Sequence, residues 1–306
     1  MTRVFIDGSA GTTGLRIRER LELRRDIALV QLPEEFRKDV NARAEAMGQS
    51  DVVFLCLPDD AAREAVTLAG SARVIDTSTA HRTLNSWDYG FPELHGQREK
   101  IAGSKRVANP GCHASGFIAL VEPLVREGLL DAAEMLTCFS VTGYSGGGKK
   151  MIAEYETENR PEEFDAPRQY ALGQSHKHLP EMQKLCGLET APVFCPIVAD
   201  YYSGMCVTVP LFASQLKCRA SELPEVYRAY YSGPIVKYSD CAAMAAGNEL
   251  SGRDDMLIGV AGNEARILLI SRFDNLGKGA SGAAIQNMNL LLGAEETTGL
   301  VIGGST

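Results

Sequence analysis

Residues 5–17 have the sequence FIDGSAGTTGLRI, in which a short apolar run is followed by three glycines and a helical pattern. Arg3–Ile6 predict a buried strand. Thr13–Arg25 predict a helix, because apolar residues recur on one face and Arg and Glu lie on the other. A strand, a glycine turn and a helix in this order are typical of the first unit of a parallel α/β sheet. This opening decides the expected fold class.

The same alternation continues over the next 60 residues or so. The expected strands are Ile27–Leu32, Val52–Leu57 and Val74–Asp76. The expected helices between them are Val40–Met47 and Ala61–Ala69. Strands that alternate with helices favour right-handed crossovers, so this part predicts a parallel sheet.

After about Ser115 the pattern changes to longer alternating runs separated by loops rich in Gly, Pro and charge. The expected strands are Leu136–Val141, Met205–Leu211 and Ala265–Ser271. This part predicts an α+β domain. A final helical pattern, Lys278–Leu292, is expected to pack on another domain.

Composition excludes several classes of protein. The chain has 306 residues, enough for two domains, with 45% hydrophobic and 23% charged residues and a net charge of -8. It has no block of Lys or Arg for nucleic acid and no apolar run of the length of a membrane span, and we expect no export signal. Its eight cysteines include no C-x-x-C pair, which favours free thiols in a reducing compartment. We expect a cytoplasmic protein with a small-molecule partner.

The glycine turn, Gly8–Gly14, has the spacing G-x-x-G-x-x-G. Glycines let backbone N–H groups approach a pyrophosphate at a helix N-terminus, although many glycine turns bind nothing. An acid that binds the adenosine ribose is expected about 20 residues further on. That region holds Gln31, Glu34, Glu35, Arg37 and Lys38. These residues do not decide between NAD and NADP, but the two cations favour NADP.

Cys112 lies in the sequence Asn109-Pro110-Gly111-Cys112-His113-Ala114-Ser115-Gly116, immediately before a helical pattern over Phe117–Arg126. A helix N-terminus favours a thiolate, so Cys112 is a candidate nucleophile. The alternative is a small residue packed under a helix cap. The other seven cysteines lack this setting and are expected to be inert.

Two histidines, His176 and His178, stand in a polar loop before the expected helix at Leu179-Pro180-Glu181. Histidine is the side chain best suited to move protons near neutral pH, so this pair is a candidate acid/base. Surface or structural roles are the alternative. The H-x-H spacing also suits a metal, but no third ligand of convincing spacing follows, so we expect no metal.

Two further segments follow expected strands. Arg82 ends the sequence Asp76-Thr77-Ser78-Thr79-Ala80-His81-Arg82 and is a candidate clamp for an oxyanion, with an ordinary surface arginine as the alternative. Gly143–Lys150 has the sequence GYSGGGKK, which offers N–H groups and cations to a second anion. The same composition also suits a flexible hairpin.

With these segments the sequence resembles the family of shorter-type N-acetyl-γ-glutamyl-phosphate reductases, which is related to aspartate-semialdehyde dehydrogenases. The resemblance runs almost end to end. It is carried by FIDGSAGTTGLRI, CLPDDAAREA, DTSTAHR, WDYGFPEL, NPGC, GYSGGGKK, HKHLPEM and FDNLGKGASGAAIQNMNLLLG, in this order.

The resemblance implies a Rossmann-type parallel sheet domain, residues 1–113 completed by the C-terminal helix in 278–306, and a glyceraldehyde-3-phosphate-dehydrogenase-like α+β domain, residues 114–277. It implies a homo-tetramer or dimer. The residue roles that it implies are Cys112 as nucleophile and His176 and His178 as acid/base; Arg82, Ser145 and Gly146 at an acyl phosphate; and Gly8, Ser9, Gly11, Thr12, Thr13, Gly14, Asn275, Gly277 and Lys278 at NADP(H). One departure is His113, where relatives commonly have Tyr, so a third imidazole lies beside the thiol.

The expected reaction is attack of Cys112 on an acyl phosphate, release of phosphate, and reduction of the thioester to an aldehyde. Aspartate-semialdehyde dehydrogenase uses the same chemistry on a substrate whose amine is free. A nucleotide-sensing regulator without catalysis would also keep this fold. A cysteine hydrolase would use the same thiol but leaves the glycine turn unexplained.

Overall fold

The structure is a computed structural model, and it describes residues 1–303. The chain divides into two compact units. The first comprises Met1–Pro110 with Ala280–Leu300, and the second Gly111–Gly279 with the segment from Val301 onward. The expected boundary after residue 113 therefore lies three residues late, and residues 111–113 belong to the second unit. Of the expected C-terminal segment 278–306, residues 304–306 lie outside the described part.

The first unit contains a six-stranded parallel sheet in the order β2-β1-β3-β4-β6-β5. Its strands are β1 (Thr2–Asp7), β2 (Ile27–Val30), β3 (Val52–Leu55), β4 (Arg73–Asp76), β5 (Asp88–Tyr89) and β6 (Arg106–Ala108). Its helices are α1 (Thr12–Glu22), α2 (Val40–Gly48), α3 (Asp59–Leu68), α4 (Gln97–Gly103) and α9 (Gly282–Leu291), with a 3-10 turn at Glu34–Phe36. The first four strands and first three helices coincide with the sequence prediction to within a few residues.

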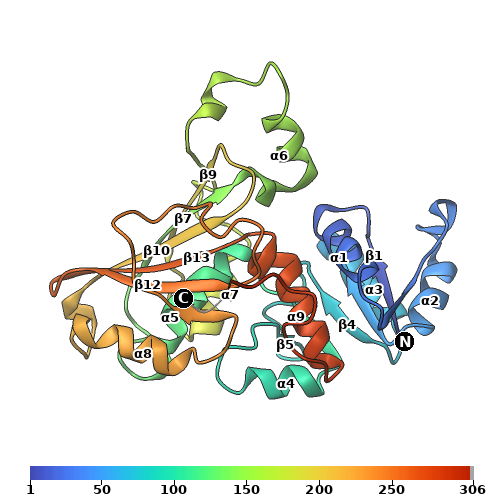
Figure 1. Ribbon diagram of the computed structural model, residues 1–306, viewed down its shortest axis with the longest axis horizontal. Helices are drawn as coiled ribbons and strands as arrows, with labels where there is room; N and C mark the ends of the chain where they lie inside the picture. Colours follow the sequence, from blue (N-terminus) through green and yellow to red (C-terminus); the bar gives the residue numbers. More distant parts are fainter. Residues whose placement is uncertain (304–306) are drawn as a thin grey trace. The chain divides into compact units, whose positions relative to one another are not determined.

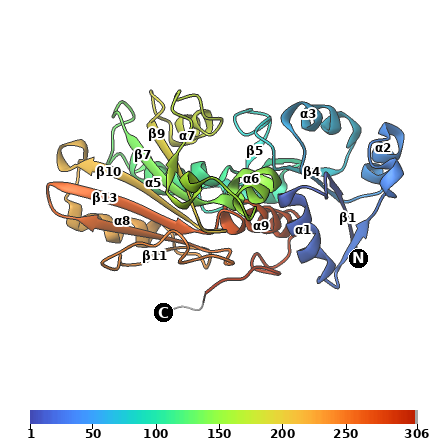
Figure 2. The ribbon, with the colours of Figure 1, turned by 90° about the horizontal axis from the view of Figure 1, so that it is seen from above.

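Helices cover both faces of this sheet because its strands are apolar on both sides. Val4 and Ile6 of β1 pack in one cluster with Ala284 and Met288 of α9, whereas Phe5 packs in the other cluster, with residues of α2 and α3. α9 contacts α1, α4 and β4, and Figure 2 shows it beside α1. The C-terminal helix thus completes the core of the first unit.

The second unit is built on a mixed seven-stranded sheet in the order β11-β12-β13-β10-β7-β9-β8 (Figure 1). Its strands are β7 (Thr137–Gly143), β8 (Arg168–Gln169), β9 (Val193–Ala199), β10 (Met205–Phe212), β11 (Val236–Tyr238), β12 (Met256–Gly262) and β13 (Arg266–Phe273). Its helices are α5 (Cys112–Arg126), α6 (Gly148–Tyr155), α7 (Leu179–Cys186) and α8 (Leu223–Tyr230). Short turns lie at Tyr144–Gly147, Glu162–Asp165, Ala213–Gln215 and Ala220–Glu222, and a π-helical turn lies at Gly277–Ser281.

Helix α5 packs closely on one face of this sheet. A Cβ at Gly116 would lie 2.8 Å from Ser271 Oγ and 2.9 Å from a ring carbon of Phe273, so only glycine allows this approach. On β10 the residues facing α5 are buried, and the alternate residues are partly exposed. The opposite face of the sheet is therefore partly open, and its exposed side chains include Phe139, Val193 and Phe212.

Candidate functional site

The glycine turn connects β1 to α1. Gly8 has φ +87°, and a Cβ there would overlap the carbonyl oxygen of Cys56. A Cβ at Gly14 would lie 2.5 Å from the Gly8 carbonyl oxygen. These two positions require glycine for different reasons, a left-handed backbone and a close approach of chain segments. The predicted turn is present and leads directly into the N-terminus of α1.

A pocket of about 300 Å³ opens beside this turn within the first unit. Its lining includes Asp7–Ala10 and Leu29–Leu32, which lie at the carboxyl ends of the neighbouring parallel strands β1 and β2. Of the residues that the sequence placed near an adenosine ribose, Gln31, Glu34, Arg37 and Lys38 line the pocket. Arg37 and Glu34 form an ion pair of 2.7 Å across one side of it. The pocket thus carries both signs of charge.

A buried ion pair supports the start of the glycine turn. Arg43 of α2 donates from Nε and from a terminal nitrogen to Asp7 Oδ2, at 3.1 and 2.8 Å. Burial raises the pKa of Asp7, and the hydrogen bonds and charge of Arg43 oppose that rise. Sequence reasoning missed this pair. The sequence signal that could have indicated it is Asp7 itself, a carboxylate at the end of a buried strand, because a buried carboxylate needs a partner.

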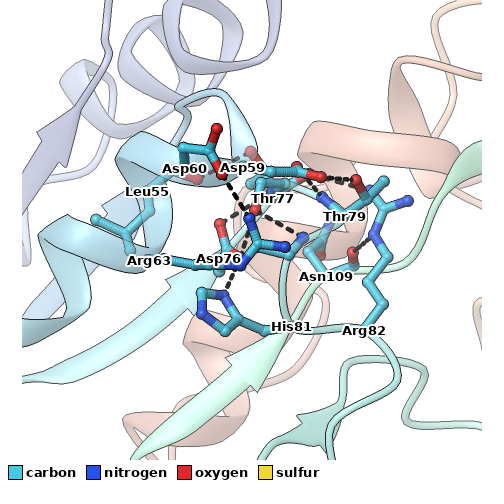
Figure 3. Close-up of polar contacts among 12 residues, drawn as sticks. Leu55, Asp59, Asp60, Arg63, Asp76, Thr77, Thr79, His81, Arg82 and Asn109 are labelled. Carbon is cyan, nitrogen blue, oxygen red and sulfur yellow. Dashed lines mark hydrogen bonds and ion pairs between the residues drawn. The ribbon is translucent and has the colours of Figure 1, made fainter. Parts of the chain in front are cut away.

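The segment Asp76–Arg82 forms a hydrogen-bonded turn after β4 (Figure 3). The Asp76 carboxylate is fully buried and accepts from Ser78, and His81 Nδ1 lies 2.6 Å from its Oδ2. The His81 ring stacks on Trp87 at 4.1 Å. Arg82 does not lie on the surface, since it is 9% exposed.

Arg82 joins the ends of two neighbouring strands in the first unit. Its Nε donates to the carbonyl oxygen of Asn109 at 2.9 Å, and a terminal nitrogen donates to that of Thr77 at 3.0 Å. The Asn109 side chain donates to the Ala280 carbonyl and accepts from Asn287. Asn109 is thus held by hydrogen bonds of both its carbonyl oxygen and its side-chain amide. The sequence alone gave it no separate role.

Cys112 is the first residue of α5, as the sequence predicts, and it is partly exposed. A Cβ at Gly279 would lie 2.9 Å from the Cys112 Cβ, so glycine leaves space beside the thiol. Burial raises the pKa of Cys56 to about 12 and that of Cys138 still higher. All eight cysteines lie among the described residues, and none of them forms a disulfide.

Three histidine rings gather in the second unit. His113 and His176 have centroids 5.6 Å apart, His113 and His178 5.5 Å, and His176 and His178 4.6 Å. The backbone N–H of His178 donates to His176 Nδ1 at 3.2 Å. A ring nitrogen that accepts carries no proton, so the N–H of neutral His176 is on Nε2.

Glu181 lies in the first turn of α7 and is 1% exposed. Its Oε2 accepts from the backbone N–H of Gly111 at 3.1 Å, and its Oε1 lies 3.9 Å from His178 Nε2. This carboxylate therefore connects the residue before Cys112 with the histidine loop. Sequence reasoning placed Glu181 only at the helix start and missed this contact.

Ser145, Gly146 and Asn275 come together at the end of β7. Ser145 is 1% exposed, and its Oγ accepts from Asn275 Nδ2 at 3.0 Å, while Asn275 Oδ1 accepts from the backbone N–H of Gly204 at 2.7 Å. The Gly143–Lys150 segment forms a 3-10 turn followed by α6, not a hairpin.

The residues expected at NADP(H) divide between the units. Gly8, Ser9, Gly11, Thr12, Thr13 and Gly14 belong to the first unit, and Asn275, Gly277 and Lys278 to the second. Lys278 is 1% exposed, and a Cβ at Gly277 would overlap the carbonyl of Arg253. Within residues 1–303, no group of three or more His, Cys, Asp or Glu side chains is placed to hold a metal ion.

None of the helices formed by residues 1–303 combines the length and the apolar character needed to cross a membrane.

Comparison with known proteins agrees with this architecture. Residues 3–104 match the family model described as semialdehyde dehydrogenase, NAD binding domain, and residues 112–275 match the one described as semialdehyde dehydrogenase, dimerisation domain. The chain is similar in fold to aspartate semialdehyde dehydrogenase II from Vibrio cholerae, with a TM-score of 0.72 at 18% identity over 95% of this chain and 98% of that chain. It is similar to the aspartate semialdehyde dehydrogenase with NADP from Candida albicans, with a TM-score of 0.69 at 16% identity over 95% and 98% of the two chains.

A sequence relative is more specific. The chain is 45% identical to the N-acetyl-gamma-glutamyl-phosphate reductase of Brucella ovis over 95% of this chain and 99% of that protein. The relatives of Brucella canis and Brucella suis carry the same name at the same identity. Near-complete coverage at this identity shows that the chain belongs to the N-acetyl-γ-glutamyl-phosphate reductase family, within the semialdehyde dehydrogenase fold.

Proposed function

We propose that this protein is a cytoplasmic enzyme of arginine biosynthesis that reduces N-acetyl-γ-glutamyl phosphate to N-acetylglutamate semialdehyde, with NADPH as reductant and release of phosphate. The observation that carries the proposal is the position of Cys112, a partly exposed thiol at the first residue of α5 in the unit that holds His176 and His178. A thiolate is favoured at a helix N-terminus, where unpaired N–H groups also stabilise a developing oxyanion.

In the proposed reaction, the Cys112 sulfur attacks the acyl carbon and phosphate leaves, so that the acyl group is held on the enzyme as a thioester. NADPH, when bound, would supply the hydride for reduction of the thioester. A histidine then donates a proton to the departing Cys112 sulfur as the aldehyde forms. In this proposal the donor is the imidazolium form of one member of the His176 and His178 pair, and the Glu181 carboxylate lies 3.9 Å from His178 Nε2.

For the substrate, we propose that Ser145, Gly146 and Arg82 bind the acyl phosphate. The Ser145 hydroxyl is oriented by Asn275, and Gly146 lies beside it in a tight turn. Arg82 is a buried guanidinium oriented by two carbonyl oxygens. Such fixed groups lose little freedom when an anion binds.

For the cofactor, we propose that Gly8, Ser9, Gly11, Thr12, Thr13 and Gly14, with Asn275, Gly277 and Lys278, hold NADP(H). The turn fits a pyrophosphate because Gly8 and Gly14 allow the chain to turn tightly into the N-terminus of α1. Arg37 and Lys38 line the neighbouring pocket and favour a 2′-phosphate, whereas Glu34 favours a ribose hydroxyl. Glu34→Gln should therefore raise the preference for NADP over NAD, measured as the ratio of the two kcat/KM values.

We also propose that the protein is a homo-oligomer, a dimer or tetramer. The match of residues 112–275 to a dimerisation domain supports assembly through the second unit. The apolar, partly open face of its sheet is the surface best suited to a second copy.

The decisive experiment is the reverse reaction, with N-acetylglutamate semialdehyde, phosphate and NADP, followed by the absorbance of reduced cofactor at 340 nm. We expect a phosphate-dependent signal that is lost when aspartate semialdehyde replaces the acetylated substrate. Activity with aspartate semialdehyde alone would assign the other substrate, and no phosphate-dependent signal with either would reject the reductase reaction.

A further inference from the structure

His113 occupies the centre of a cluster of side chains in the second unit. It is 3% exposed, and both of its ring nitrogens have hydroxyl partners. Nδ1 lies 2.7 Å from Ser140 Oγ on β7, and Nε2 lies 2.7 Å from the Tyr170 hydroxyl just beyond β8. The ring is thus held between two segments that are far apart in sequence.

The surroundings of His113 favour the neutral ring. The rings packed against it belong to Tyr170, His176, His178 and Phe194, and with Ser140 these neighbours include no carboxylate. An imidazolium here would be desolvated without an opposite charge. Burial, reinforced by the charge of His176, accordingly lowers the pKa of His113 to about 3. A neutral ring offers one N–H and one lone pair, and the two hydroxyls use both.

Tyr170 is the outer partner in this chain of hydrogen bonds. Its backbone N–H donates to the Pro196 carbonyl at 3.0 Å, and its ring packs edge-on to His176 at 6.0 Å. Burial raises the pKa of Tyr170, and the charge of Cys112 raises it further. The phenol therefore remains protonated within electrostatic range of the proposed nucleophile.

We propose that His113 is a positioning residue of the reductase reaction: a neutral imidazole that fixes the Tyr170 hydroxyl near Cys112, packs against the His176 ring and transfers no proton itself. The inference rests on the proposed function. It assigns proton transfer to the His176 and His178 pair and adds Ser140 and Tyr170 to the supporting hydrogen-bond chain. Tyr170, on which the charge of Cys112 acts, connects these hydrogen-bonded residues to the thiol.

Two matched variants distinguish the hydrogen bond to Tyr170 from the hydrogen bond to Ser140. In His113→Gln the longer side chain places its amide near the position of Nε2, within reach of Tyr170. In His113→Asn the amide lies near the position of Nδ1 and reaches only Ser140. Tyr170→Phe removes the hydroxyl while keeping the ring.

The first readout is the rate at which iodoacetamide alkylates Cys112 in the full-length protein at pH 7, measured by mass spectrometry of its peptide, with Cys112→Ser as the blank. This readout needs no substrate. We expect the rate to fall about three- to tenfold in His113→Asn and Tyr170→Phe, the scale of one neutral hydrogen bond, and to stay within about twofold of the wild type in His113→Gln.

The second readout is the pH profile of the reverse reaction. We expect His113→Asn and Tyr170→Phe to lower kcat with little change in the KM of the semialdehyde, and we expect both limbs of the profile to remain. Loss of one limb in both His113 variants would show that His113 transfers the proton. Equal losses in the Gln and Asn variants would exclude the Tyr170 connection.

Folded variants with wild-type alkylation and kcat, but lower stability, would make the role of His113 purely structural and overturn the proposal. If the wild-type protein shows no phosphate-dependent reaction, the proposed function fails, and the alkylation series still decides whether His113 positions Cys112.

Discussion

Cys112 and His113 are neighbours in the sequence, yet their surroundings differ completely. Cys112 is partly exposed at a helix N-terminus, and His113 is buried between two hydroxyls. Consecutive residues in the first turn of a helix point in different directions, so one can face a site and the other the core. The local sequence pattern identified Cys112, but it could not rank the three histidines as proton carriers.

Replacing Cys112 with serine tests the nucleophile. A serine hydroxyl remains protonated at neutral pH, so we expect Cys112→Ser to lower kcat by at least about three orders of magnitude. NADPH binding should be retained, measured by the quenching or shift of cofactor fluorescence. A variant with near wild-type turnover would exclude covalent catalysis by Cys112.

The buried His113 should make the stability of the protein depend on pH. Its pKa is about 3 in the folded protein against 6.5 as the ordinary value, so between these values the unfolded chain binds more protons. Stability is therefore fully present above about pH 6.5 and falls as the pH is lowered, by about 2 kcal/mol between pH 7 and pH 5 through this residue.

Urea unfolding of the wild type and of His113→Gln at both pH values measures this contribution. We expect the free energy of unfolding of the variant to fall less between pH 7 and pH 5 than that of the wild type. Parallel losses in the two proteins would mean that His113 is not the group responsible.

At the scale of elements, the glycine turn shows what a sequence can predict. The spacing of Gly8, Gly11 and Gly14 and the flanking apolar periods located the strand, the turn and α1 to within a few residues. The conformation of such a turn depends on residues that are close together in the sequence, so a local pattern can predict it.

Interactions between distant segments were not predictable in the same way. The Asp7–Arg43 pair joins residues 36 apart, and the partners of His113 lie 27 and 57 residues away. The strands β9 and β12 are interior strands of the second sheet, each next to an edge strand, and the sequence did not predict them. Pairing across a sheet depends on register over long chain separations, which no single segment encodes.

Replacing Gly8 with alanine tests the turn as an element. Alanine is strained at φ +87°, and its Cβ would overlap the Cys56 carbonyl, so we expect a loss of at least about 2 kcal/mol in stability and weaker NADP(H) binding. Thermal unfolding and cofactor titration measure the two effects.

Gly48→Ala is the matched control, since a Cβ at Gly48, the last residue of α2, meets nothing within 4 Å. We expect this control to be neutral or stabilising by up to about 1 kcal/mol, with unchanged cofactor binding. If Gly8→Ala behaved like Gly48→Ala, the turn would not need glycine at that position.

At the scale of the whole molecule, the remaining question is assembly. The face of the second sheet opposite α5 carries exposed apolar side chains: Phe139 is 43%, Val193 55% and Phe212 64% exposed. Soluble proteins rarely leave a contiguous apolar surface open, which favours burial of this face against a second copy. Phe139 lies on β7, a strand paired on both sides within the sheet, so it is the best position to test.

Phe139→Glu should dissociate the proposed oligomer, because a carboxylate buried there without a partner costs about 2 kcal/mol or more, or about 30-fold in the dissociation constant. Size-exclusion chromatography with light scattering measures the mass across a dilution series. Leu23→Glu is the control, since Leu23 is 85% exposed on the first unit and should leave the mass unchanged. A wild-type protein that is monomeric throughout the series, or a folded Phe139→Glu variant with the wild-type mass, would rule out assembly through this face.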